Sequence, residues 1–148
     1  MLKKWKNKKL LKNEKGLTLV ELLAVIVILA IIAAIAVPAI GNIVNKSKDR
    51  AILAEASNIL AGAKIAYIDG ACVDNTCSNT ELKPFVDGIE LKSGDQVEYN
   101  ETSKVWTITY SRLGSIKLSE YKTNLNGNAI TETNLNTNLT KAGVTTTP

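Results

Sequence analysis

Residues 17–40 read LTLVELLAVIVILAIIAAIAVPAI, and the organisation of the rest of the chain follows from this apolar stretch. It has 24 residues, with no polar side chain from Leu22 to Val37. As a helix it is about 36 Å long at 1.5 Å per residue, and the hydrocarbon core of a bilayer is about 30 Å thick. A buried core helix would need a large domain around it, which a chain of 148 residues does not supply. We therefore expect residues 17–40 to form a transmembrane helix.

The segment before this stretch, residues 1–16, is a basic leader. It contains seven lysines and one glutamate, a net charge of +6, whereas the rest of the chain has a net charge of −2. A basic segment next to an apolar helix normally stays on the cytoplasmic face of the membrane. The part beyond the leader has no basic excess to neutralise phosphates, so its charge does not support bulk binding of DNA.

Residues 41–69 continue the helix with an amphipathic pattern. One face carries apolar side chains at intervals of three, four and one: Ile52, Ala56, Ile59, Leu60, Ala63 and Tyr67. Gly70 is the expected stop. Pro38 lacks a backbone N–H and crowds the preceding turn, so the sequence predicts one helix from Leu17 to about Ile68, kinked at Pro38.

Residues 70–122 have the pattern of a small antiparallel sheet. The sequence from Ser78 to Glu81 fits a capping box, which predicts a helical turn to about Phe85. Three runs predict the strands of a meander: 96–99, 105–110 and 115–121. One sheet face should pack on the apolar face of the helix, because neither surface is stable alone in water. The expected fold class is α+β, a long kinked N-terminal helix packed on a small antiparallel β-meander.

Residues 123–148 are rich in threonine and asparagine, which make up 14 of these 26 residues. The bulky apolar side chains are few: Leu125, Ile130, Leu135 and Leu139. This composition favours a flexible tail, with an extra edge strand as the alternative.

The chain has two cysteines, Cys72 and Cys77, and no histidine. If this region lies outside the cytoplasm, a disulfide is favoured, with free thiols as the alternative. Two cysteines without histidine leave a tetrahedral zinc site two ligands short. The missing histidine also excludes Ser-His-Asp and Cys-His catalysis, and the acids of the head have no catalytic spacing. We expect no catalytic residue, metal or cofactor.

Aromatic side chains alternate along two of the predicted strands: Tyr99 on the first, and Trp106 and Tyr110 on the second. A platform that stacks bases or sugars is one interpretation. The alternation within strands favours structural packing instead.

Glu21 is the ionisable residue of the apolar stretch. A carboxylate inside a membrane helix costs about 2.5–3.5 kcal/mol on insertion scales. One interpretation is that Glu21, five residues into the run, reaches the headgroups. The other requires cleavage after Gly16, which would free the α-amine of Leu17 one helical turn before Glu21. The amine of one copy could then pair with Glu21 of another, which removes both charges from the apolar medium and fixes the register of assembly.

Residues 15–23, KGLTLVELL, followed by the apolar run and Pro38, resemble the N-terminal processing signal of type IV pilins and of secretion or competence pseudopilins. The resemblance covers about residues 12–45. It implies that a prepilin peptidase cuts between Gly16 and Leu17 and methylates the new amine. It also implies that Glu21 sets subunit registration and that Pro38 marks a helix break. One departure is Leu17, because phenylalanine is the usual first mature residue in the family.

The resemblance further implies a structural subunit rather than an enzyme. Its expected partners are copies of itself in a helical filament, the prepilin peptidase/methyltransferase, an inner-membrane assembly platform and membrane lipid before assembly. The expected location is the cytoplasmic membrane, as a single span with a cytoplasmic N-terminus, and then a filament at the cell surface. A surface pilus, a competence pseudopilus for DNA uptake and a secretion pseudopilus remain alternatives.

Two other interpretations compete with a filament subunit. Ala34-Ile35-Ala36 resembles a signal-peptidase site, and cleavage there would release residues 37–148 as a secreted protein. That cleavage would leave Glu21 and the Gly16 junction unexplained. The second competitor is a membrane-anchored enzyme, for which the scattered acids offer no recognisable site.

Overall fold

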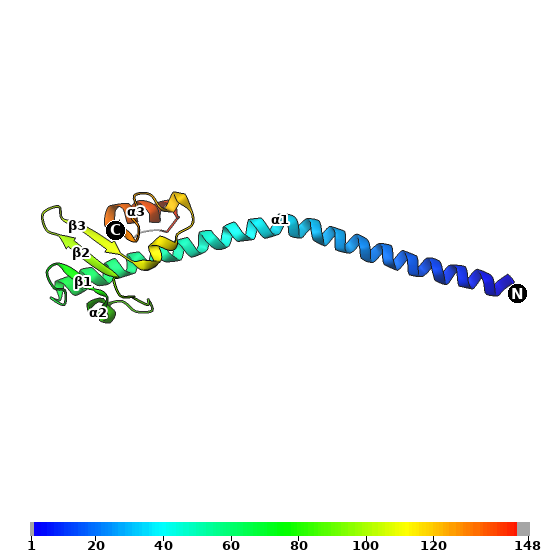
Figure 1. Cartoon of the computed structure of the whole chain (residues 1–148), viewed down its shortest axis with the longest axis horizontal. Helices are drawn as coiled ribbons and strands as arrows, with labels where there is room; N and C mark the ends of the chain where they lie inside the picture. Colours follow the sequence, from blue (N-terminus) through cyan, green and yellow to red (C-terminus); the bar gives the residue numbers. More distant parts are fainter. Residues whose placement is uncertain (1, 145–148) are drawn as a thin grey trace. The chain divides into compact units, whose positions relative to one another are not determined.

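A computed structural model of the chain describes the backbone of residues 2–144 and the side chains of residues 15–144. The chain divides into two compact units, Met1–Ile43 and Val44–Pro148. A single long helix, α1 (Leu2–Ile68), contributes to both units, and the second unit adds a four-stranded sheet and short helices (Figure 1). The predicted α+β class, with a long apolar N-terminal helix and a small antiparallel sheet, is confirmed.

The first unit is the N-terminal part of α1, and it begins earlier than the sequence suggested. The helix starts at Leu2 rather than at Leu17, so the basic leader is helical and Gly16 is inside the helix instead of extended. Leucine and lysine are good helix formers, and they dominate the leader. The adjoining apolar helix also supplies a nucleus from which helix propagates through them. Pro38 lies within α1, and the kink expected there stays a prediction.

In the second unit α1 runs from Val44 to Ile68 and ends as expected. Gly70 has a φ of +76°, the left-handed conformation that glycine adopts without strain. The Ala71 N–H donates to the Ala66 carbonyl at 2.9 Å, and the Gly70 N–H donates to the Tyr67 carbonyl at 3.2 Å. This pair of hydrogen bonds is the Schellman motif, which satisfies carbonyl groups at the end of a helix.

Four antiparallel strands form the sheet in the order β1-β2-β3-β4. They are β1 (Thr76–Ser78), β2 (Gln96–Asn100), β3 (Val105–Thr109) and β4 (Ala129–Thr131). The hairpin of β2 and β3 confirms the first two predicted strands, and its register pairs Val97 with Ile108. Strand β1 was not predicted, since its three residues are too few to show alternation.

The predicted capping box is present at the start of α2 (Asn79–Leu82). The Ser78 N–H donates to the Glu81 carboxylate at 2.8 Å. A 3₁₀ turn, η1 (Lys83–Phe85), continues α2 to the predicted end.

The third predicted strand, residues 115–121, is wrong. Two 3₁₀ turns occupy this region, η2 (Ser111–Ser115) and η3 (Ser119–Tyr121). The N–H groups of Lys117 and Leu118 donate to the carboxylate of Asp49 on α1, at 3.1 and 2.8 Å, instead of to a neighbouring strand. These two N–H groups are therefore bonded to a buried acid on the helix and cannot donate to a neighbouring strand.

The flexible-tail prediction for residues 123–148 is wrong for the part that the structure describes, which ends at residue 144. Strand β4 adds to the edge of the sheet beside β3, as the alternative proposed, and is followed by α3 (Glu132–Lys141). Leu135 and Leu139, four residues apart, share one helix face and are fully buried. Thr131 caps α3 by accepting a hydrogen bond from the Asn134 N–H. Residues 145–148 lie outside the described part.

The core lies between α1 and the sheet, as predicted. The apolar face of α1 is buried from Ile52 to Ala63, and Tyr67 packs at its edge. Val97 and Ile108 contribute from the sheet, and Ile130 with the buried leucines of α3 extends the same cluster. The aromatic side chains Tyr67, Tyr99 and Trp106 contact one another, with ring centroids 4.6 to 5.4 Å apart, in agreement with a packing role.

Candidate functional site

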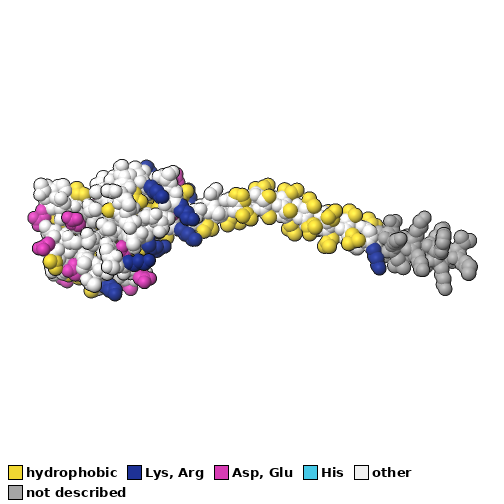
Figure 2. Space-filling view, viewed as in Figure 1, with side chains coloured by type: hydrophobic (Ala, Val, Ile, Leu, Met, Phe, Trp, Pro, Cys, Tyr) yellow, Lys and Arg dark blue, Asp and Glu magenta, His cyan; other side chains and the backbone are white. Residues whose placement is uncertain are grey.

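The junction, residues 15–21, lies on the part of α1 that belongs to the first unit. Its leucines and its valine are more than half exposed, as are the other bulky apolar side chains as far as Ile43. Figure 2 shows this part of α1 covered with apolar side chains. Side chains of this kind are not stable in water over such a length, so this helix requires lipid or other apolar helices around it.

Length and composition agree with a membrane span. Within residues 15–144, α1 is the one helix that is long and apolar enough to cross a membrane, with a mean hydropathy of 3.1 in its most apolar window. None of that window is buried within the structure, unlike the core helix of a soluble protein. Membrane anchoring through this helix follows from its composition and exposure.

Gly16 and Leu17, the predicted cleavage residues, occupy an open position on α1. A Cβ placed on Gly16 would have no neighbouring atom within 4 Å, and the Leu17 side chain is 61% exposed. The Thr18 hydroxyl donates to the Lys15 carbonyl at 3.1 Å, a bond that crosses the 16–17 peptide. The 16–17 peptide, where cleavage is predicted, is therefore helical, and a peptidase that binds extended substrate would first have to unwind this turn. Glycine lowers local helix stability by about 1 kcal/mol relative to alanine, which eases that unwinding at Gly16.

Glu21 lies four residues after Leu17, and residues spaced by four share one helix face. The side chain is exposed among apolar neighbours, of which Val20 and Leu22 are each 63% exposed. The ion pairs found within residues 15–144 are Lys64–Glu132 and Arg112–Glu55, so Glu21 has no cationic partner inside that part of the chain. The carboxylate of the junction is available to a cation from elsewhere.

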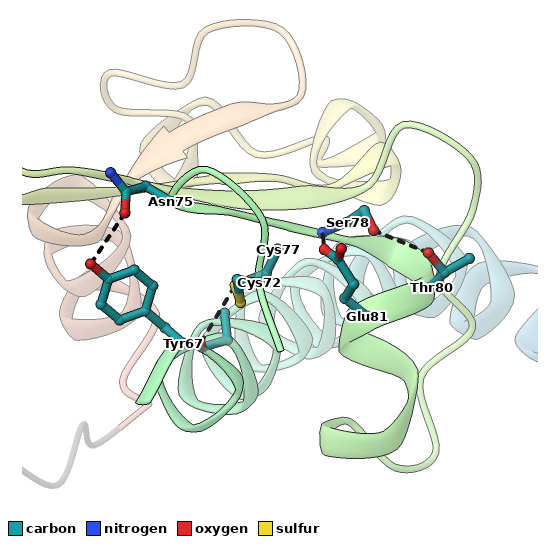
Figure 3. Close-up of a disulfide and its surroundings, with 8 residues drawn as sticks. Tyr67, Cys72, Asn75, Cys77, Ser78, Thr80 and Glu81 are labelled. Carbon is teal, nitrogen blue, oxygen red and sulfur yellow. Dashed lines mark hydrogen bonds between the residues drawn. A yellow bond between two sulfur atoms is a disulfide. The ribbon is translucent and has the colours of Figure 1, made fainter. Parts of the chain in front are cut away.

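The structure joins Cys72 and Cys77 in a disulfide directly after α1, with their Cα atoms 4.5 Å apart (Figure 3). The Cys77 sulfur is fully buried and lies 3.7 Å from the Ala63 carbonyl oxygen of α1. Beside the disulfide, the Tyr67 hydroxyl donates to the Asn75 side chain at 3.2 Å. The disulfide favoured by the sequence is thus present, and its loop is held between α1 and β1.

A polar cluster ties the start of η2 to α1. The Tyr110 hydroxyl donates to the Glu55 carboxylate at 2.7 Å, and Arg112 pairs with the same carboxylate. Burial raises the pKa of Tyr110 to about 12, with the hydrogen bond to Glu55 and its negative charge adding to the effect. Tyr110 is therefore neutral at physiological pH and serves as a hydrogen-bond donor inside the head, which is a structural role.

Metal chemistry has no support in the described part. Residues 15–144 contain no group of three or more histidine, cysteine, aspartate or glutamate side chains placed to hold a metal ion. The predicted site residues fall on different parts of the chain: Gly16, Leu17 and Glu21 share the junction, Pro38 lies further along the same helix, and the cysteines belong to the second unit.

Sequence reasoning missed two features of these sites. The first is the helical state of the 16–17 peptide, for which the helix-forming composition of the leader was the available signal. The second is the role of Asp49, whose signal was an acid on the apolar side of the amphipathic helix, three residues before Ile52.

Comparison with known proteins gives one match. Residues 11–37 match the family described as the prokaryotic N-terminal methylation motif. No curated protein and no solved structure shows significant similarity to the chain. The matched residues contain the whole junction, and they are the type IV pilin/pseudopilin signal. This motif, together with an apolar anchoring helix and an α+β head, supports a protein of the type IV pilin/pseudopilin type.

Proposed function

We propose that this chain is a structural subunit of a type IV pilus or pseudopilus. A prepilin peptidase cuts between Gly16 and Leu17, the new α-amine of Leu17 is methylated, and the mature subunit polymerises through α1 into a helical filament. The motif belongs to a structural rather than an enzymatic class, in line with this role.

The observation that carries the proposal is the exposed carboxylate of Glu21, four residues after Leu17 in an apolar helix, which has no ion-pair partner within residues 15–144. In a membrane its charge costs about 2.5–3.5 kcal/mol on insertion scales. A freed amine on Leu17 of a neighbouring copy provides the opposite charge at nearly the same depth. Pairing inside an apolar medium is favourable only where the two groups meet closely, so it selects one axial stagger between copies.

The orientation of the chain in the membrane follows from the charge of the leader. The seven lysines of the leader keep the N-terminus and the scissile bond on the cytoplasmic side, and the head then lies beyond the outer surface of the cytoplasmic membrane. The disulfide of Cys72 and Cys77 fits that oxidising side. Before assembly the partners are lipid, the peptidase/methyltransferase and an assembly platform, and after assembly they are other copies at the cell surface.

The test is Glu21→Ala in cells that assemble the filament. We expect normal membrane insertion and normal cleavage but no filaments, because the register-setting pair is missing. Glu101→Ala, in the turn between β2 and β3, is the matched control and should assemble normally. Filaments of wild-type amount and length from the Glu21→Ala subunit would refute the pairing role.

A further inference from the structure

Five basic residues from three separate segments lie at one end of the second unit. This is the end where the unit's part of α1 begins. They are Lys46, Lys48, Arg50, Lys117 and Lys141, and we call them the basic collar. All five are exposed. Figure 2 shows lysine and arginine side chains concentrated at this end of the head, while acidic side chains lie mainly elsewhere on the visible face.

Asp49 adds no negative charge to the surface of the 46–50 turn. It is the acid of the 46–50 turn, but it is 1% exposed and its carboxylate accepts hydrogen bonds from the N–H groups of Lys117 and Leu118. Its side chain points inward. On a helix, Lys48 and Arg50 lie 100° to either side of Asp49, and both face solvent. The same hydrogen bonds bring Lys117 next to this turn.

Arg50 connects the turn to the end of α3. Its guanidinium lies so close to Gly143 that a Cβ placed there would be 3.1 Å from the Arg50 Nη2 atom. Lys141, in the last turn of α3, donates to the Thr123 hydroxyl at 2.7 Å and remains exposed. The collar thus combines α1, the segment after η2 and α3, which are far apart in the sequence.

No carboxylate neutralises the collar within the part of the chain whose side chains the structure describes. The ion pairs found there use Lys64 and Arg112 as their cations. The five positive charges of the collar are therefore available to an external anion.

We propose that the basic collar binds the phosphates of anionic phospholipid headgroups at the outer surface of the membrane and holds the head there before assembly. The proposal rests on the membrane insertion proposed above. The apolar run of α1 ends at Ile40, and Lys46, Lys48 and Arg50 lie about 9, 12 and 15 Å further along a helix axis. Ile43 and Val44 continue the apolar surface to about 3 Å before Lys46. Lys46 therefore lies near the outer edge of the headgroup layer, which is about 6 Å thick on each side of the hydrocarbon core, and Lys48 and Arg50 lie further out. Long basic side chains at this depth reach phosphates readily.

The expected strength of this lipid binding makes the collar a reversible anchor. A lysine or arginine near an anionic surface contributes about fivefold to binding, and this attraction is screened by salt. Three lysines together account for about a hundredfold, enough to favour a docked head while leaving the subunit extractable by assembly. A second copy of the chain, through its acidic side chains, is the competing partner.

The test uses the full-length chain in phosphatidylcholine vesicles with and without phosphatidylglycerol. Flotation with the vesicles first establishes membrane insertion. Hydrogen exchange is then followed in the segments 44–50, 115–122 and 138–144. The variant K46Q/K48Q/K117Q removes three collar charges, and K83Q/K92Q/K104Q removes three exposed charges from other segments of the head as the matched control.

We expect phosphatidylglycerol to slow exchange in the three segments at least fivefold in the wild type and in the control variant, but not in the collar variant or in high salt. Inserted protein without this lipid-dependent protection would overturn the collar proposal and leave the filament proposal intact. Protection that follows protein density rather than phosphatidylglycerol would also overturn it and would assign the collar to a second copy. Failure to float would count against membrane insertion itself, and with it both proposals.

Discussion

The junction combines two residues that each destabilise a membrane helix. Gly16 weakens the helix by about 1 kcal/mol relative to alanine, and Glu21 places a charge in an apolar run at a cost of about 2.5–3.5 kcal/mol. In the proposed function each has a use. Gly16 makes it easier for the helix to unwind around the bond that is cut. The carboxylate of Glu21 can then pair with the amine that cleavage releases. A spacing of four residues puts Leu17 and Glu21 on one helix face.

Replacement of Gly16 by valine should leave an uncut precursor in the membrane. A β-branched side chain at the scissile bond is bulky where glycine leaves the backbone accessible. The measurement is the electrophoretic mobility of membrane-bound protein after expression with the peptidase. Gly41→Val, at another open glycine of α1, is the control and should be cut normally. Normal processing of Gly16→Val would rule out this cleavage site.

Tyr110 makes the stability of the head depend on pH in the alkaline range. The pKa of Tyr110 in the folded head is about 12, above its usual value of 10.0. Because the pKa is raised on folding, the neutral tyrosine stabilises the folded head below pH 10. This stabilisation is lost as the pH rises towards 12. The free energy of unfolding should therefore fall across this window by on the order of 1–2 kcal/mol more in the wild type than in Tyr110→Phe.

Urea unfolding at several pH values measures this difference. Glu55→Gln keeps the burial of Tyr110 but removes the charge beside it, so it should give an intermediate slope. Equal slopes for wild type and Tyr110→Phe would show that the buried hydroxyl does not titrate differently in the folded head.

At the scale of elements, α1 and the segment after α2 approach each other at a glycine. A Cβ on Gly62 would lie 2.6 Å from Val86 Cγ2 and 2.8 Å from the Phe85 carbonyl oxygen. Alanine normally stabilises a helix relative to glycine by about 1 kcal/mol. Here the clash includes backbone, which cannot rotate away, so the packing at this crossing requires glycine.

Gly62→Ala should therefore destabilise the head, by about 1–3 kcal/mol, against the trend of helix propensity. Gly41→Ala, with no atom within 4 Å of its Cβ, should leave the head's stability unchanged. Thermal unfolding of both variants followed by circular dichroism compares them directly. A Gly62→Ala head that is as stable as the wild type would contradict the close approach.

The elements that the sequence predicted correctly are those whose signal is local. The apolar run and the spacing from Ile52 to Tyr67 define α1, and alternation defines β2 and β3. Residues 115–121 also alternate, but the buried carboxylate of Asp49, far away in the sequence, takes their N–H donors. Such a tertiary contact has no local signature.

The prediction for the region from β4 to α3 was wrong for a different reason. Its threonines and asparagines have low helix propensity and its bulky apolar residues are few, so composition predicted a flexible tail. Burial of Leu135 and Leu139 against the core, with Thr131 as the helix cap, stabilises α3 despite that propensity. For the junction the residues and their spacing were evident from the sequence. The helical state of the 16–17 peptide was not, because the basic composition of the leader sets it apart from the apolar run that follows.

At the scale of the whole molecule, the two units divide the work. The first contains the apolar residues 17–40, with Glu21 as their one acidic residue, and the second is a disulfide-linked α+β head with its own core. On our account the apolar helix of the first unit is stable only in lipid or among its own copies. Cleavage after Gly16 is the step that allows this helix to leave the lipid and pack among copies. The basic collar would hold the head at the membrane until then.

The mature N-terminus tests this account most directly. Intact mass spectrometry of the protein from peptidase-containing cells, with fragment ions that read its first residues, gives the answer in one measurement. We predict a chain that begins at Leu17 with one methyl group on its α-amine. A chain that begins at Val37, or one that keeps residues 1–16, would contradict the account.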